Sequence, residues 1–313
     1  PVGRAIDSKQ KVLLLYSFEP LWVNDAHYSE KHISFIKQSL SDLQKQLSSH
    51  GTKILIVQED IIEVFKKLHF IENIATIFSY QETGMKITFD RDKKVSKWCK
   101  QHHVHWKQNI QNGVFRGIQN RKKWKNDWVD FINIPIHKPD MDLANFFSTT
   151  ELTAHFGHLF KHVTLKTTTS KYLQPGGTSQ AIKYLNTFLN ERISGYNINY
   201  SKPATSRLFS SRLSPYLAWG NLSVRQVCQY AASHKKNLAN KRNLSSFLSR
   251  LRWQAHFIQK FEMEIEMEFQ SVNSGYHQLI KEQQPHLQKA WREGQTGIPL
   301  IDAAMRCLVT TGY

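Results

Sequence analysis

The sequence predicts an α/β protein in two parts. A parallel-sheet domain is expected over residues 1–133 and an all-helical domain over residues 178–313, with a linker over 134–177. Short apolar runs alternate with amphipathic segments in the first part, as they do in parallel sheets. From about Ile134 to Pro175 the composition shifts to Pro, Thr, His and Lys, which is typical of a linker. Beyond Gly177 the apolar residues follow helical spacing.

The elements of the first part follow from periodicity. The run KVLLLYSF at 11–18 is continuously apolar, as expected of a strand covered on both faces. A helix over 30–48 follows, because apolar residues recur there at steps of three and four and Gly51 lies just beyond. Asp60 is a predicted helix N-cap. The remaining elements are strands over 53–57, 75–80 and 104–108 and a helix over 86–101.

Four longer helices are expected in the second part. They cover residues 178–193, 224–233, 244–269 and 299–309, and Thr178 is the predicted N-cap of the first. The third includes Met263–Phe269, in which acids alternate with apolar residues. We interpret that stretch as a continuation of the helix rather than as a strand.

Composition restricts the class of partner. Forty-two Lys and Arg against 25 Asp and Glu give a formal net charge of +17, which favours polyanionic partners such as nucleic acids. No run approaches the roughly 18 apolar residues of a membrane span. Cys99, Cys228 and Cys307 lack metal-ligand or CxxC spacing, which argues against a zinc site or a disulfide framework. This cysteine usage indicates a reducing compartment such as the cytoplasm.

One basic stretch allows two interpretations. Between residues 112 and 131, Arg and Lys side chains interleave with Trp124 and Trp128. Such a pattern fits a nucleic-acid surface with stacking aromatics. It also fits a docking helix that buries both tryptophans and exposes a basic face, and we favour this second interpretation.

The end of the chain, WREGQTGIPLIDAAMRCLVTTGY at 291–313, carries the most specific pattern. Gly294 and Gly297 permit a turn, and Pro299 suits the first turn of a helix. The order of these residues resembles the flavin-domain signature of the DNA photolyase/cryptochrome family. In that family a first strand precedes the region seen here and a long helical region follows the signature. The resemblance therefore implies that this chain is an internal fragment with an incomplete FAD-binding domain.

A second segment, SSRLSPYLAWGNLS at 210–223, resembles the family's flavin-diphosphate loop. The resemblance assigns the FAD diphosphate to Ser210, Ser211, Arg212, Leu213 and Ser214. Hydroxyls, backbone N–H groups and one Arg in a turn suit a pyrophosphate. A shorter copy, TSRL at 205–208, lacks the SPYL context that follows. Tyr196 and Phe247 fall at positions where the family contacts the flavin.

The segment FLSRLRWQAHFIQKFE at 247–262 resembles the helix that faces damaged bases in photolyases. Matching Trp253 to the family's second tryptophan makes Arg250, Trp253 and Gln254 the residues that face DNA. Here Arg250 stands where the family has a lesion-binding Glu, and Gln254 replaces an Arg. A carboxylate that hydrogen-bonds a base has thus become a cation that prefers phosphate. No catalytic residue and no metal ligand are assigned.

The resemblance implies an FAD-dependent blue-light photolyase that repairs pyrimidine lesions in DNA by photoinduced electron transfer. Its alternative is a cryptochrome photoreceptor, which signals through a protein partner without repair. Arg250, Gln254 and the lack of a Trp between Trp253 and Trp291 favour the cryptochrome alternative or a photolyase for a divergent lesion, and the net charge of +17 favours DNA. The family also implies a second antenna chromophore, a folate or a deazaflavin. A basic nucleic-acid-binding protein without flavin would require both long signatures to be coincidental.

Overall fold

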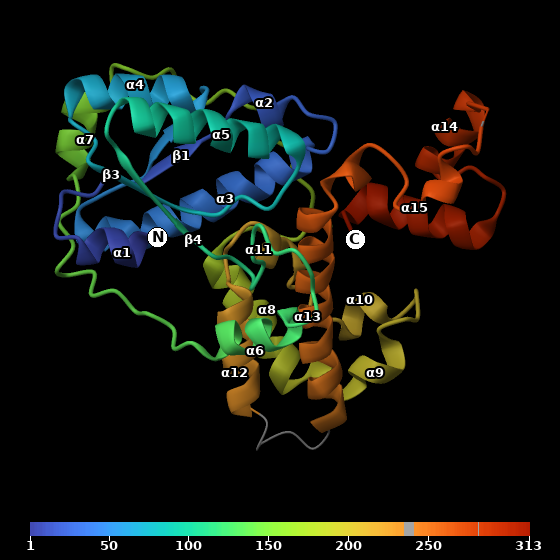
Figure 1. Ribbon diagram of the computed structural model, residues 1–313. Helices are drawn as coiled ribbons and strands as arrows, with labels where there is room; N and C mark the ends of the chain where they lie inside the picture. Colours follow the sequence, from blue (N-terminus) through green and yellow to red (C-terminus); the bar gives the residue numbers. More distant parts are fainter. Residues whose placement is uncertain (235–240, 281) are drawn as a thin grey trace.

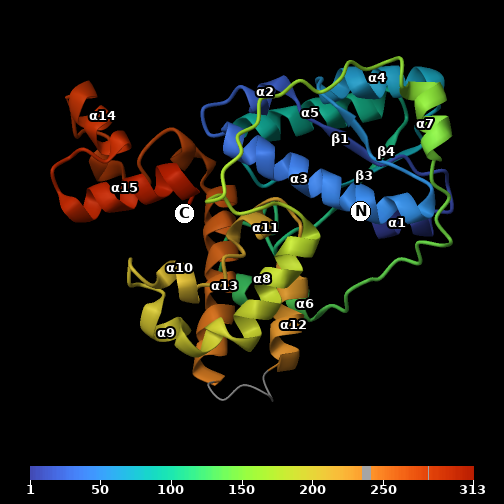
Figure 2. The ribbon, with the colours of Figure 1, turned by 180° about the vertical axis from the view of Figure 1, so that it is seen from behind.

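The computed structural model describes residues 1–234, 241–280 and 282–313. It divides into an α/β part at the upper left of Figure 1 and a helical part, most of which lies below it and whose last two helices lie to its right. Figure 2 shows from behind how the connecting chain runs along the side of the α/β part before it enters the helical part. Alternating strands and helices in the first part and helices in the second confirm the predicted fold class.

The strands pair in parallel, as the alternation of strands and helices predicts. β1 (Leu15–Ser17) pairs with β2 (Leu55–Val57), and β3 (Thr76–Tyr80) pairs with β4 (His105–Asn109). In the described residues they form two separate two-stranded sheets. β1 is shorter than the predicted strand over 11–18, because Val12 forms an isolated bridge with Phe146 instead of joining the ladder.

Helices cover both pairs of strands. α1 (Val2–Asp7) and α2 (Pro20–Val23) are short, whereas α3 (Glu30–Leu47), α4 (Ile61–Ile71) and α5 (Lys86–Gln101) match the predicted helices closely. Asp60 caps α4 as predicted, since its Oδ1 accepts the N–H of Ile62 at 2.8 Å. The buried faces of α4 and α5 meet through Phe65 and Trp98, whose ring centroids lie 5.4 Å apart.

Part of the predicted linker packs with the α/β part. α7 (Thr149–Phe156) begins at Ser148 with a capping box, and its Leu152 and Phe156 are almost fully buried. They share a core with Val57 and Val64. The composition of this stretch is polar, but its few apolar side chains are placed to complete a core.

α6 (Trp124–Asn133) is a docking helix, as we favoured. Trp124 and Trp128 are buried, and their indole N–H groups donate to the carbonyls of Gly113 and Asn112 at 3.1 and 3.2 Å. Both tryptophans belong to the core of the helical part. The end of the predicted first domain therefore contributes to the second.

The helical part contains one apolar core, to which none of the described residues beyond Ala255 contributes. Its elements are α8 (Thr178–Asn190), α9 (Tyr196–Asn199), α10 (Ser206–Phe209), α11 (Ser214–Ala218), α12 (Val224–Ser233), α13 (Lys241–Met263), α14 (Pro285–Glu293) and α15 (Pro299–Thr311). Phe188, Tyr216 and Val227 are fully buried in this core. None of the helices in the described ranges is long and apolar enough to span a membrane.

Two predicted details are wrong. The N-cap of α8 is Gly177 at φ +115°, and the Thr178 hydroxyl donates instead to the carbonyl of Asn221 at 3.3 Å. α13 ends at Met263, because Glu264 leaves the helical conformation at φ −127° and ψ 51°. A short 3-10 helix over Ile265–Glu268 then replaces the predicted continuation.

The signature segment near the end of the chain forms a turn that is held by side-chain hydrogen bonds. The Asp302 carboxylate accepts the N–H and the hydroxyl of Thr296, both at 2.7 Å, and the N–H of Gly297 at 3.1 Å. These bonds lower the pKa of Asp302. Arg306 donates to the carbonyl of Gly294 at 2.7 Å, which holds α15 against the end of α14.

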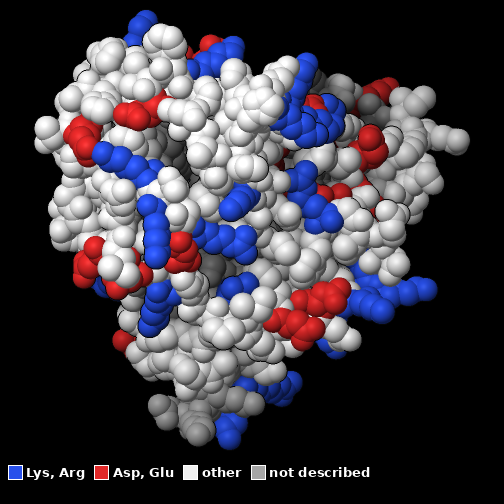
Figure 3. All heavy atoms as spheres, turned by 60° about the vertical axis from the view of Figure 1, so that its left-hand side comes forward, with Lys and Arg blue, Asp and Glu red and all other residues white. Residues whose placement is uncertain are grey.

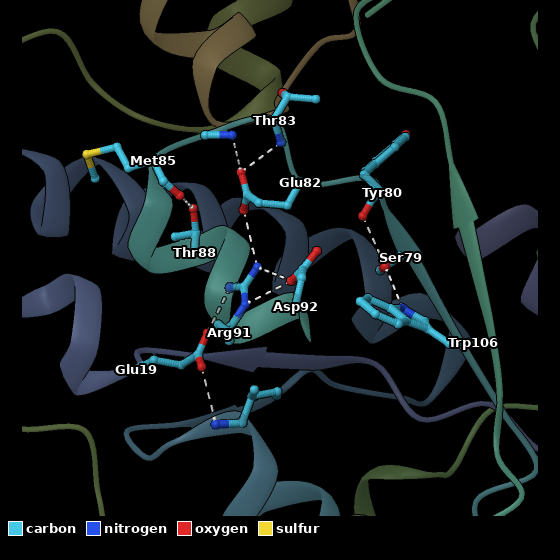
Figure 4. A network of polar contacts seen from close by, with 12 residues as sticks. Glu19, Ser79, Tyr80, Glu82, Thr83, Met85, Thr88, Arg91, Asp92 and Trp106 are labelled. Atoms are coloured by element: carbon cyan, nitrogen blue, oxygen red, sulfur yellow. Dashed lines mark hydrogen bonds and ion pairs between the residues drawn. The ribbon is translucent and has the colours of Figure 1, made fainter. Parts of the chain in front are cut away.

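A partly buried ionic network links the ends of β1 and β3 (Figure 4). The Arg91 guanidinium on α5 contacts Glu19, Glu82 and Asp92 at 2.9, 3.2 and 2.8 Å. Burial raises the pKa of Glu19 and of Asp92, although Arg91 opposes the rise in both.

Figure 3 shows that basic side chains are numerous elsewhere on the surface, gathered across the middle of the face in view.

Candidate cofactor-binding site

The loop at 210–214 joins α10 to α11 in a constrained conformation. Arg212 adopts φ +58°, which is uncommon for a residue with a side chain and marks the loop as a specially held turn. Leu213 is 1% exposed and anchors the loop in the helical core. Ser210, Ser211 and Arg212 are half-buried, and Ser214 is exposed at the start of α11.

Gln174 in the connecting chain fixes the backbone and the side chain of Arg212. Its Nε2 donates to the Arg212 carbonyl at 2.6 Å, and its Oε1 accepts from Arg212 Nε at 3.1 Å. Gln174 also lines a cavity of about 370 Å³ between α3 and the connecting chain. The connecting chain is held close to α3 at Gly176, where a Cβ would meet the carbonyl oxygen of Phe35 at 2.1 Å.

Three arginines converge on this loop. Arg192 donates to the carbonyls of Ser210 and Tyr184, and Arg207 donates to the carbonyl of Tyr172 at 3.1 Å. Burial, together with the nearby Arg207, lowers the pKa of Arg212. Burial and Arg212 likewise lower the pKa of Arg192. The positive charge of Arg212 is therefore repelled by Arg207 on one side and by Arg192 on the other.

The loop thus fits a polyanionic group. None of these three arginines forms an ion pair with a carboxylate of the described residues, although Glu191 lies near enough to act on the pKa of Arg192. The hydroxyls of Ser210, Ser211 and Ser214 lie in the same turn. Converging cations and hydroxyls form the donor set that a diphosphate requires.

Tyr313 connects this loop with the predicted flavin contacts. Its hydroxyl lies 3.1 Å from Ser210 Oγ, and the Arg212 guanidinium lies 4.9 Å from the centre of its ring. Tyr313 and Arg250 are also both close enough to Tyr196 to influence its pKa, which burial raises. The loop, the end of α15 and the start of α9 therefore share one neighbourhood.

Tyr196 and Phe247 lie together, but both are buried in the helical core. Tyr196 is 7% exposed and Phe247 2% exposed, and their ring centroids lie 6.2 Å apart. Phe188 packs edge-on against both rings. On its other side Tyr196 contacts Tyr200, at a centroid distance of 5.5 Å. Tyr196 and Phe247, the two predicted flavin contacts, therefore form a buried aromatic wall behind Tyr200 and do not line an open surface.

The residues predicted to face DNA lie on the outer side of α13. Arg250 is exposed, and its guanidinium lies 5.0 Å from the centre of the Tyr200 ring. Trp253 is 50% exposed, whereas Gln254 is half-buried. The Arg250–Tyr200 contact connects this face with the Tyr196 neighbourhood.

Sequence reasoning missed several members of the site. Arg192, Gln174 and Tyr313 were not singled out, and the TSRL copy containing Arg207 was set aside. Arg192 contacts Ser210, 18 residues further along the chain, and no motif marks such a contact. The copy at 205–208 did carry a signal, since it repeats the Ser-Arg-Leu of the loop itself.

Two family models match this chain, one in its α/β part and the other in its helical part. Residues 1–121 match the DNA photolyase family model, and residues 247–313 match the FAD binding domain of DNA photolyase. A deoxyribodipyrimidine photo-lyase of Alkalihalophilus pseudofirmus is 30% identical over 44% of this chain and 28% of its own length. One of Synechococcus is 25% identical over 100% of this chain and 68% of its own length.

A solved structure has a similar fold. A cryptochrome from Synechocystis superposes over the whole chain with a TM-score of 0.82, at 20% sequence identity, and this chain covers 68% of it. Among the first curated relatives that it matches, the chain spans between 22% and 68% of their length.

Proposed function

We propose that this chain, which belongs to the photolyase/cryptochrome family, is part of an FAD-dependent photolyase that repairs pyrimidine lesions in DNA under blue light. The observation that carries the proposal is the diphosphate-fitting loop at 210–214, with three converging arginines, beside a helix whose outer face carries Arg250 and Trp253. The proposed cofactor loop and the proposed DNA face would then belong to one helical domain.

The chain's own residues have binding and positioning roles. Arg212 and the serine hydroxyls would hold the diphosphate, and Arg192 and Gln174 hold the loop in shape through its backbone carbonyls. The aromatic wall of Phe188, Tyr196 and Phe247 excludes water from the side facing the core. FAD, when bound in reduced form, supplies the light-driven electron that splits the lesion. A second, light-collecting chromophore stays a prediction from the resemblance.

The test is repair of defined lesions under blue light. Oligonucleotides carrying either a cyclobutane dimer or a (6-4) photoproduct are irradiated with the FAD-loaded protein, and restored pyrimidines are measured by chromatography. A dark reaction and an Arg212→Ala variant serve as controls. Repair of either lesion that requires both light and Arg212 supports the proposal. Flavin binding without repair of either lesion contradicts it.

Arg250 favours a second candidate function, that of a cryptochrome photoreceptor. A cation at a position predicted to face bases does not accept the hydrogen bonds of a thymine edge. Its guanidinium lies over Tyr200 instead of standing free. A light-dependent change in protein association, measured by light scattering in the absence of DNA, would support this candidate. Repair activity would exclude it as the sole function.

A further inference from the structure

The connecting chain forms an arch over α3 that is held to the helix at both ends. At one end the N–H of Thr168 donates to Ser34 Oγ at 2.8 Å, and the Ser34 hydroxyl lies 2.9 Å from the Thr168 carbonyl oxygen. At the other end the N–H of Gly176 donates to Gln38 Oε1 at 2.7 Å. Thr168 and Gly176 thus fix the span of the arch, and residues 169–175 cross between them.

A cavity of about 370 Å³ lies under the arch. α3 lines it with one helix face, from Lys31 to Gln38, and the connecting chain lines it with residues 168–171 and 173–175. Its volume is at the small end of the roughly 300–1,000 Å³ that small-molecule pockets occupy. The cavity therefore has room for a small molecule.

Two lysines line the cavity, and no carboxylate of the described residues does. Lys31 Nζ donates to two carbonyls at the end of α15, which holds its ammonium in place. The lysines that form ion pairs in the described ranges do not include Lys31 or Lys171. The acids of α3 are Glu30 and Asp42; both lie outside the lining, and Asp42 Oδ2 accepts the N–H of Ser179 at 3.0 Å. Within the described chain, the positive charge of the cavity is thus not offset by an ion pair.

The arch also offers hydrogen-bond donors that the described part of the protein does not use. The backbone N–H groups at 169–171 donate to none of the described residues, and the hydroxyls of Thr168 and Thr169 have no hydrogen-bond partner there either. The Lys171 ammonium lies 5.2 Å from the centre of the Tyr172 ring, a contact that leaves its three N–H donors unused. Cations and unused donors in one cavity are complementary to an anion with several acceptor oxygens.

Phosphate has the acceptor oxygens that this set of groups requires, because lysines, hydroxyls and backbone N–H groups all donate to it. The cavity is larger than one phosphate group. On its α3 side Gln38 Nε2 has no hydrogen-bond partner among the described residues, so it can donate to a hydroxyl on the rest of the bound molecule. We infer that this cavity binds a small phosphomonoester of the sugar-phosphate kind, with its phosphate held by Lys31, Lys171 and the donors at 168–171.

The inferred site is separate from the loop at 210–214. None of the five described residues of that loop lines the cavity. Gln174 is the wall between the two, since it lines the cavity and bonds Arg212 through both ends of its amide. The inference goes beyond the proposed function, because it involves neither flavin chemistry nor DNA.

The test measures binding of ribose 5-phosphate to the full-length protein in the dark. Equilibrium dialysis with the radiolabelled compound gives its Kd, in a phosphate-free buffer with excess FAD so that any flavin site is occupied. Displacement by unlabelled inorganic phosphate and by ribose gives the Kd of each part of the molecule. We expect ribose 5-phosphate to bind, inorganic phosphate to bind more weakly and ribose not to displace the label.

Paired substitutions locate the binding in the cavity. Lys31→Gln combined with Lys171→Gln should raise the Kd for ribose 5-phosphate by roughly ten- to a hundredfold or more, as loss of charge-assisted phosphate contacts does. Lys45→Gln combined with Lys161→Gln removes one exposed lysine each from α3 and from the connecting chain, outside the cavity, and should change nothing. Lys171→Gln alone breaks no hydrogen bond of the described residues, so it gives the answer even if Lys31→Gln disturbs α15.

The same Kd in Lys171→Gln and in the unmodified protein would overturn the inference, as would equal losses in the two double variants. Loss of binding in Arg212→Ala but not in Lys171→Gln would assign the ligand to the loop at 210–214 and would also overturn it. An equal or lower Kd for inorganic phosphate would replace the phosphomonoester by free phosphate. Because no light, lesion or DNA enters these measurements, failure of the repair proposal leaves their result intact.

Discussion

The side-chain amide of Gln259 bonds the backbone of Phe115 through both of its ends. The N–H of Phe115 donates to Gln259 Oε1 at 2.7 Å, and Gln259 Nε2 donates to the Phe115 carbonyl at 2.9 Å. Gln259 is fully buried on α13, and Phe115 lies in the chain that leads from β4 to α6. One side chain thus ties α13 to the chain segment that follows β4.

We expect Gln259→Leu to lower the free energy of unfolding by about 2–4 kcal/mol. The substitution keeps the size of the side chain but leaves a buried N–H and a buried C=O without partners, and each costs roughly 1–3 kcal/mol. Urea denaturation followed by circular dichroism measures the change. Gln101→Leu, at an exposed position at the end of α5, is the control and should shift the midpoint little.

The elements of the fold that could be predicted from the sequence are those that depend on interactions between residues close together along the chain. α5 and α12 were predicted with their exact bounds, because the local spacing of apolar residues indicates an amphipathic helix. β1, β2 and β3 are five, two and one residues shorter than predicted, and β4 is shifted by one residue, since the ends of a strand depend on which neighbour continues the ladder. α7 was missed because its apolar residues are few and the core that receives them is made by β2 and α4, far away in the sequence.

A sequence motif can point to the candidate site only where its residues are contiguous. The loop at 210–214 carries its chemistry in five successive residues, and the structure shows it as a constrained turn. Arg192, Gln174 and Tyr313 reach the same loop from other segments, and only the tertiary structure brings them there. The docking of Gln259 on Phe115 is of the same kind, since a lone Gln in a helix gives no sign of its partner.

A second expectation concerns the Arg91 network shown in Figure 4. Arg91→Met keeps the length of the side chain but leaves Glu19, Glu82 and Asp92 without their shared cation. Removing one partner of a buried ionic group is strongly destabilising, by about 3–5 kcal/mol at neutral pH. Urea denaturation at pH 7 measures the loss, and Arg4→Met, on the short N-terminal helix α1, is the control.

The effect of Arg91→Met should depend on pH in a defined direction. Burial already raises the pKa of Glu19 and Asp92 above their ordinary values in the native protein, and the loss of Arg91 raises both further. The folded state then binds more protons than the unfolded state, so the stability of the variant falls as pH rises through the interval between the ordinary and the raised pKa. Most of the loss should disappear near pH 4. A loss that stays constant from pH 4 to pH 7 would contradict this electrostatic account.

The third expectation is that Arg212 binds the FAD diphosphate. Loss of one charge-assisted phosphate contact costs about 1.5–3 kcal/mol, so Arg212→Ala should raise the Kd for FAD roughly ten- to a hundredfold. Quenching of flavin fluorescence on titration measures it. Arg207→Ala tests whether the neighbouring copy contributes through its charge, and a smaller increase is expected because its guanidinium is engaged by the Tyr172 carbonyl. Equal Kd values for Arg212→Ala and the unmodified protein would remove the loop assignment.

The last expectation separates two roles of Arg250. Its guanidinium is exposed on α13 above Tyr200, and no carboxylate of the described residues pairs with it. If Arg250 contacts a phosphate, Arg250→Ala should weaken binding to damaged and undamaged DNA by the same factor. The slope of log K against log salt should then fall by roughly one unit. Lys45→Ala, an exposed cation on α3, is the control and should leave the slope unchanged.

We expect the phosphate role for Arg250, because a guanidinium offers hydrogen-bond donors only and phosphate oxygens accept them in any nucleotide sequence. If the variant instead keeps its salt slope and loses its preference for damaged DNA, Arg250 reads the lesion itself, and its replacement of the family's carboxylate is then a change of substrate.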